Sequence, residues 1–129
     1  MAFDIELATA TGFMEVSGEP EEGQRAFAHV IVNRLKSGKF GPTLAAVVLK
    51  AYQFSCWNTS DPNRMRLATE PESNPIFEKI RGFILSAMDG SDDDPTNGAL
   101  FYFNPKLAMP EWAKSMTKMA DIGSHSFYK

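Results

Sequence analysis

The chain has 129 residues, and its 13 lysines and arginines against 16 aspartates and glutamates give a formal net charge of -3. That length suits one domain, and such a chain buries roughly two-thirds of its unfolded surface, so a core needs no disulfide or metal. An apolar content of 43% argues against a disordered chain, and the mild acidity argues against a nucleic-acid binder with a basic face. A single cysteine, Cys56, excludes an intramolecular disulfide.

The N-terminal segment predicts neither export nor membrane insertion. Asp4 and Glu6 stand where a secretory signal peptide has a basic start followed by a long apolar run. No stretch approaches the roughly 20 apolar residues of a membrane span. We therefore expect synthesis in a cytoplasm, and release by another agent if the target lies beyond the membrane.

The first half of the chain predicts three helices. Apolar residues at helical spacing indicate an amphipathic helix over residues 3–15. A second helix is predicted over residues 21–37, with acidic residues at its start and Gly38 at its end. A short third helix is predicted over residues 42–49.

The middle of the chain combines a long loop with the most clearly marked helix. Residues 52–74 show no regular pattern, and a loop of that length inside a domain is usually functional or partly disordered. Asn74 is a typical N-cap, Pro75 suits the first helical position, and Gly90 is a typical stop. A helix is therefore predicted between these signals.

The C-terminal third predicts the small β element. Residues 91–98 form a polar turn region, and residues 99–103 are β-prone by composition. A short helix is expected to start at Pro110, and residues 122–128 suit a short strand or an ordered loop. The predicted fold is thus a mostly helical α+β domain over residues 1–129.

Glu15 is the strongest candidate for chemistry. It lies near the end of the first predicted helix, beside Phe13, Met14 and Val16. A carboxyl among apolar neighbours has a raised pKa because desolvation disfavours its charged form, and a general acid needs that tuning near neutral pH. From spacing alone, an exposed glutamate at a helix end is the commoner case.

The other acidic residues suggest structural roles. Glu19, Glu21 and Glu22 are expected to cap and charge the start of the second helix. Residues 92–94 are three aspartates, but they lack the alternation and distal glutamate of a calcium loop, so we expect a solvated turn. No zinc-binding spacing of cysteine and histidine is present, and we expect neither a metal nor a cofactor.

Aromatic residues gather around Trp57 and over residues 101–103. Sugar rings have apolar faces that pack on aromatic rings, so both clusters suit the wall of a glycan groove. Core packing is favoured for the two phenylalanines of the second cluster. On a strand, Tyr102 and Asn104 would share the opposite face and bring a phenol beside an amide.

Four ordered motifs carry a resemblance to a known family. They are EVSGEPEEGQ at residues 15–24 followed by VNR at 32–34, QFSCW at 53–57, DPTNGALFYFNP at 94–105 and IGSHSFY at 122–128. Each is weak alone, but the ordered set spans nearly the whole chain and resembles the cell wall hydrolases related to spore cortex-lytic enzymes.

The resemblance implies a fold related to lytic transglycosylases and goose-type lysozyme, and cleavage of the β-1,4 bond between N-acetylmuramic acid and N-acetylglucosamine in peptidoglycan. Glu15 matches the catalytic first glutamate of the family's E-A-x-G-E element, whereas Val16 and Ser17 replace its more frequent alanine and arginine. A bare catalytic domain without an export signal is similar to phage endolysins that depend on a membrane-permeabilising partner of the holin type.

A lytic transglycosylase agrees with the single clear carboxyl. Glycoside cleavage usually needs two carboxyl groups. In a lytic transglycosylase the C6 hydroxyl of muramic acid attacks the anomeric carbon instead and forms a 1,6-anhydro product. Glu15 would protonate the leaving oxygen and then accept the hydroxyl proton. The residues expected to orient the sugars are Tyr52, Gln53, Ser55, Trp57, Tyr102, Asn104 and His125.

Three alternatives stay open from the sequence. A hydrolysing muramidase would use Glu19 or Asp94 as a second carboxylate to activate water. A non-catalytic glycan-binding or virion structural module would leave Glu15 inert. A cysteine amidase or peptidase would pair Cys56 with His125.

Overall fold

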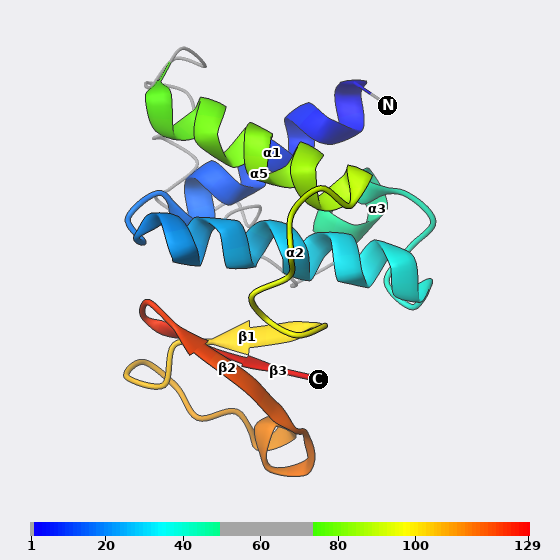
Figure 1. Ribbon diagram of the computed structural model, residues 1–129. Helices are drawn as coiled ribbons and strands as arrows, with labels where there is room; N and C mark the ends of the chain where they lie inside the picture. The colour runs from blue at the N-terminus through cyan, green and yellow to red at the C-terminus, as the bar shows by residue number, and fades with distance from the viewer. Residues whose placement is uncertain (1, 50–73) are drawn as a thin grey trace.

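The computed structural model describes residues 2–49 and 74–129 as a helical layer packed on a small sheet (Figure 1). The helices of the described residues are α1 (Ala2–Val16), α2 (Glu21–Ser37), α3 (Leu44–Leu49) and α5 (Pro75–Asp89), and the strands are β1 (Phe101–Phe103), β2 (Lys118–Ile122) and β3 (His125–Tyr128). A 3-10 helix, η2 (Glu111–Ser115), precedes β2. Helix α2 crosses the middle of the molecule, with α1 and α5 on one side and the sheet on the other.

The helix boundaries follow the predicted signals. Helix α2 has the predicted bounds, and Gly38 ends it in the left-handed conformation at φ 73°. At the start of α5 the Asn74 side chain accepts a hydrogen bond from the N–H of Ile76, with Pro75 at the first helical position. Gly90 ends α5 at φ 79°. Local signals alone therefore fix where these two helices begin and end.

The main core lies between α1, α2, α3 and α5. Its largest fully buried side chains include Phe13, Phe27, Ile31, Leu44, Ile80 and Ile84. Gly12 permits the close approach of these helices, because a Cβ there would lie 2.8 Å from side-chain atoms of both Ile80 and Phe27. Each large side chain of this core stabilises the fold by roughly 1.5–3 kcal/mol relative to an exposed position.

The three strands are antiparallel and run in the order β1-β3-β2. Phe101 pairs with Tyr128 and Phe103 with Ser126. The sequence prediction missed β2, whose pairing with β3 is interrupted by a bulge after Lys118. The predicted single strand or loop over residues 122–128 is instead the end of one strand, a turn and a second strand.

A second, smaller core joins the sheet to α2. Phe127 of β3 is fully buried there with Ala26 and Val30 of α2 and with Ala99. Because side chains alternate along a strand, Tyr102 lies on this helix-facing side of β1. The small core therefore holds Tyr102 against the helical layer.

Phe101 packs against the edge of the main core, as expected, whereas Phe103 packs on Tyr128 and Trp112. Phe101 and Phe103 are both half-buried rather than fully buried. Phe103 stacks on Tyr128 with ring centroids 5.3 Å apart, and both phenylalanines contact the ring of Trp112. The two phenylalanines thus form an aromatic cluster with Trp112 of η2, and Phe101 also meets Phe40 edge-on at 5.7 Å.

We expect Asn74→Ala to lower the free energy of unfolding by about 1 kcal/mol, since an alanine N-cap leaves the N–H of Ile76 without its side-chain acceptor. Urea titration measures this difference. Asn74→Asp keeps an acceptor and should stay near the parent. Equal stabilities for all three proteins would contradict the cap.

Candidate functional site

Glu15 lies at the penultimate position of α1 and is half-buried. Its neighbours along the chain, Met14 and Val16, are buried in the core. The phenolic Oη of Tyr102 donates a hydrogen bond to Glu15 Oε1 at 3.5 Å. The structure thus joins the candidate acid from the helical layer to a candidate sugar-orienting residue from the sheet.

Aromatic rings hold the Tyr102 side chain in place. Its ring stacks on Phe127 with centroids 5.6 Å apart, and Phe27 of α2 meets it edge-on at 6.4 Å. The His125 ring lies at a centroid distance of 4.9 Å and an interplanar angle of 88°. Tyr102 and His125, both predicted from the sequence, therefore lie together, and Tyr102 contacts Glu15.

Glu19 does not cap α2, contrary to the sequence prediction. The N-cap is Pro20, and no side-chain cap hydrogen bond is formed there. Glu19 Oε1 instead accepts a hydrogen bond from the N–H of Ser124 at 2.8 Å and lies 3.5 Å from His125 Nδ1. The Glu19 side chain lies alongside the first turn of α2, where a Cβ at Gly23 would be 3.0 Å from the Glu19 Cβ, and its carboxylate reaches the β2–β3 turn.

The environment of His125 favours its neutral form. Burial lowers the pKa of its imidazole, and the carboxylate of Glu19 partly opposes that shift. Only 15% of the side-chain surface is exposed, both for His125 and for Glu19. The pair is therefore a largely buried contact between a carboxylate and an imidazole.

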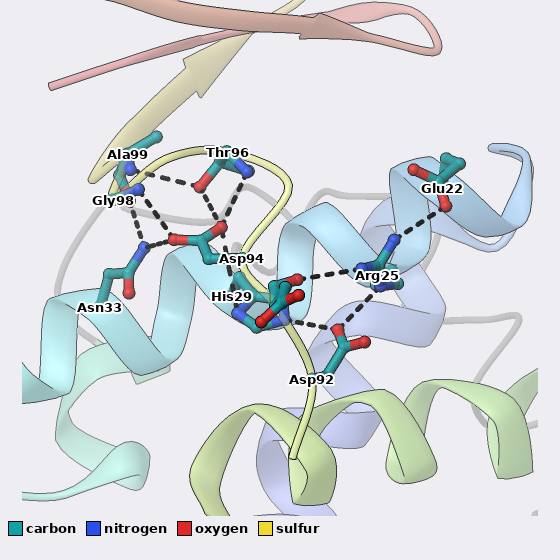
Figure 2. A network of polar contacts seen from close by, with 10 residues as sticks. Glu22, Arg25, His29, Asn33, Asp92, Asp94, Thr96, Gly98 and Ala99 are labelled. Atoms are coloured by element: carbon teal, nitrogen blue, oxygen red, sulfur yellow. Dashed lines mark hydrogen bonds and ion pairs between the residues drawn. The ribbon is translucent and has the colours of Figure 1, made fainter. Parts of the chain in front are cut away.

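Of the three aspartates of residues 92–94, Asp93 is exposed as expected, whereas Asp92 and Asp94 are bound to α2 (Figure 2). Asp92 Oδ2 accepts a hydrogen bond from Arg25 Nε at 2.7 Å and lies 2.7 Å from His29 Nε2, two side chains of α2. The hydrogen bond from Arg25, followed by that from His29, lowers the pKa of Asp92. The sequence prediction was wrong here because the partners lie more than 60 residues away along the chain.

Asp94 is held even more completely. Its Oδ1 accepts from the backbone and the hydroxyl of Thr96, and its Oδ2 accepts from the Asn33 amide and the N–H of Gly98, at 2.6–2.8 Å. Burial raises the pKa of this carboxyl, but the hydrogen bonds outweigh burial and leave the pKa below its ordinary value. Asp94 therefore shapes the loop that leads into β1.

The remaining sugar-binding candidates divide into two groups. Asn104 Oδ1 accepts a hydrogen bond from the N–H of Lys106 at 2.9 Å, so its amide closes the turn after β1. The other candidates lie outside the described residues: Tyr52, Gln53, Ser55 and Trp57, together with the alternative nucleophile Cys56.

A cavity of about 480 Å³ opens beside His125. His125 and Tyr128 of β3 lie in its wall, with Phe103 of β1 and with Lys106 and Lys118. Ligand pockets commonly measure about 300–1,000 Å³. Its mixed aromatic and polar wall suits a sugar with one apolar face and several hydroxyl groups.

Residues 2–49 and 74–129 show neither a metal-binding cluster nor a membrane-spanning helix. No three acidic, histidine or cysteine side chains gather where they could hold a metal ion. None of the helices there has the length and apolar character needed to cross a membrane.

Comparison with known proteins identifies the family. The sequence pattern of the family described as Cell Wall Hydrolase matches residues 18–128. The chain belongs to the cell wall hydrolase family. The matched region includes Glu19, Tyr102 and His125 and begins three residues after Glu15.

Curated relatives of this cell wall hydrolase extend the match to the N-terminal helix. The spore cortex-lytic enzyme of Oceanobacillus iheyensis is 36% identical over 126 residues, which cover 98% of this chain and 41% of that protein. The spore cortex-lytic enzyme of Bacillus subtilis is 32% identical over 124 residues, which cover 96% of this chain and 37% of that protein. The chain thus spans less than half the length of these relatives.

Solved structures confirm the expected fold. The catalytic domain of the Bacillus cereus SleB protein matches 100% of this chain and 91% of its own, with a TM-score of 0.79 and 32% identity. The catalytic domain of the germination-specific lytic transglycosylase SleB from Bacillus anthracis matches 98% of this chain and 93% of its own, with a TM-score of 0.76 and 32% identity. The mostly helical α+β architecture predicted from the sequence is the fold of these domains.

We expect Asp94→Asn to lower the free energy of unfolding by about 2 kcal/mol at neutral pH, because hydrogen bonds to a charged acceptor are lost and an amide donor meets other donors. The folded pKa of Asp94 is depressed, so its contribution is present above the ordinary value of 3.8 and is lost as the pH falls through the folded pKa.

Urea titrations between pH 7 and pH 3 test this dependence. The difference between parent and Asp94→Asn should shrink at the acidic end, whereas the exposed neighbour Asp93→Asn should remain near the parent throughout. A difference between parent and Asp94→Asn that is constant with pH would contradict the assignment.

Proposed function

We propose that this cell wall hydrolase cleaves the β-1,4 bond between N-acetylmuramic acid and N-acetylglucosamine in peptidoglycan, as a lytic transglycosylase, and that residues 1–129 act as one catalytic domain. The observation that carries the proposal is the likeness over 98% of the chain to a solved domain described as the catalytic domain of a lytic transglycosylase. The cytoplasmic site of synthesis and a holin-type release partner stay predictions from the sequence.

Glu15 is proposed as the single acid and base. Glu15 is half-buried near the end of α1, and its first step is donation of a proton to the bridging oxygen. The hydrogen bond from Tyr102 supports the carboxylate once that proton has left. The carboxylate then accepts the proton of the C6 hydroxyl as that oxygen bonds to the anomeric carbon.

Two other carboxylates considered as partners have structural duties, which favours a one-carboxyl mechanism. Both oxygens of Asp94 accept hydrogen bonds from its own loop and from α2. Glu19 Oε1 accepts a hydrogen bond from the N–H of Ser124 in the β2–β3 turn. An attacking hydroxyl supplied by the substrate needs no second base, and the product then carries a 1,6-anhydro end.

Sugar binding is proposed for the surface around His125. Tyr102 lies between Glu15 and His125, and the cavity walled by His125, Phe103 and Tyr128 suits a neighbouring sugar. Asn104 is proposed to act through the turn that it closes. Tyr52, Gln53, Ser55 and Trp57 remain candidates for the opposite wall from their sequence motif alone.

We expect Glu15→Gln to lower turnover of purified peptidoglycan by at least about 100-fold, since general acid catalysis contributes roughly that much and the amide cannot donate the proton. Mass spectrometry of the parent's digest should show muropeptides lighter by one water than reducing-end products. Glu21→Gln, at an exposed site on α2, is the matched control. Clearance by Glu15→Gln at the parental rate would refute the assignment.

We expect Tyr102→Phe to lower kcat about tenfold, because it removes one hydrogen bond worth roughly 1.4 kcal/mol to the carboxyl of Glu15. The ring packing against Phe127 should survive, so KM and the melting temperature should change little. A tenfold rise in KM with unchanged kcat would show that the phenol binds the ground-state substrate instead.

A further inference from the structure

We propose that Glu19 is a positioning residue, whose carboxylate fixes the β2–β3 turn and the His125 ring and thereby holds Tyr102 at Glu15. The proposal deepens the proposed function and rests on it for the role of Glu15. In this role Glu19 neither caps α2 nor activates a water molecule.

The backbone of Glu19 is a rigid base for its side chain. Its N–H donates to the carbonyl of Val16 at the end of α1, at 3.0 Å. Its own carbonyl accepts from Gln24 Nε2 of α2, also at 3.0 Å. Pro20, which follows, restricts the chain further. Glu19 is therefore anchored to both helices of the layer that carries Glu15.

The β2–β3 turn closes tightly on the carboxylate. Glu19 Oε1 accepts from the N–H of Ser124 at 2.8 Å. Gly123 has a φ of 58°, and a Cβ there would lie 2.6 Å from the same oxygen. The absence of a side chain at residue 123 thus lets the turn reach Glu19, and the contact joins the sheet to the α1–α2 connection.

The carboxylate also determines the form of the imidazole. A carboxylate can only accept hydrogen bonds, so a neutral His125 beside it carries its proton on Nδ1, 3.5 Å from Glu19 Oε1. That contact fixes the ring orientation. The fixed ring meets Tyr102 edge-on at 4.9 Å and limits the positions open to the phenol.

The contacts form one physical path from Glu19 to Glu15. Glu19 holds His125, His125 abuts Tyr102, and Tyr102 donates to Glu15. Stacking on Phe127 supports the ring of Tyr102 from another direction, so Glu19 is expected to refine the position of the phenol rather than to determine it alone.

Turnover kinetics of Glu19→Ala and Glu19→Gln test the path. Glu19→Ala should lower kcat about fivefold with KM within about twofold, less than the loss expected for Tyr102→Phe, because the hydrogen bond of Tyr102 to Glu15 is then still partly formed. Glu19→Gln keeps an acceptor oxygen and should recover most of the loss. Glu21→Ala, an exposed glutamate two residues later, is the matched control and should equal the parent.

A double-mutant cycle separates positioning from a general loss of stability. In a Tyr102→Phe background the hydroxyl is already absent, so adding Glu19→Ala should lower kcat less than about threefold further. The proposal is overturned if Glu19→Ala leaves kcat unchanged, or if the loss caused by Glu19→Ala persists in full without the hydroxyl.

A measurement independent of turnover distinguishes this proposal from the proposed function. Imidazole nitrogen shifts measured by NMR should place the proton on Nδ1 of His125 in the parent, and Glu19→Ala should move those shifts and the Tyr102 ring signals. Unchanged signals in folded Glu19→Ala would overturn the positioning role. Moved signals together with no muropeptide release by the parent would uphold it and refute the proposed function.

Discussion

A polar stripe along one face of α2 is the interaction on which the site depends. Arg25, His29 and Asn33 recur every four residues and face the loop that precedes β1, where Asp92 and Asp94 bind them. Because α2 is buried between two layers, these polar groups need partners, and the acidic loop supplies them. These hydrogen bonds hold the loop before β1 on α2, and they therefore determine the position of Tyr102 on β1.

Arg34, the residue after Asn33, adds a further attachment between α2 and the start of β1. Its guanidinium is buried, and its Nε donates to the carbonyl of Leu100, immediately before β1, at 2.6 Å. Burial lowers the pKa of this arginine to about 10, so the side chain still carries its charge near neutral pH. The charge lies over the rings of Phe40 and Phe101, which offset part of its lost hydration. The start of the sheet is therefore bound to α2 by both charge and backbone.

The helices were predictable because their signals are local. Asn74, Pro75 and Gly90 mark α5, and the ends of α2 follow from Gly38 and from apolar spacing. The sheet was harder, since β2 has little β-prone character and depends on pairing with β3. The roles of Glu19 and Asp94 could not be predicted from the sequence, because their partners lie far along the chain. Glu19 is bound by Ser124, and Asp94 is bound by Asn33. Glu15 and Tyr102 were both singled out, but their contact across two layers required the fold.

The small core that joins the sheet to α2 has a consequence for inactivation by heat. Among the described residues, the buried side chains of this small core, Phe127 chief among them, are far fewer than those of the apolar interior that the helices share. The sheet can then detach in a sub-global opening that leaves the helices intact. Such an opening separates Tyr102 from Glu15, so the enzyme would lose function at temperatures where its circular dichroism still reports a native helical content.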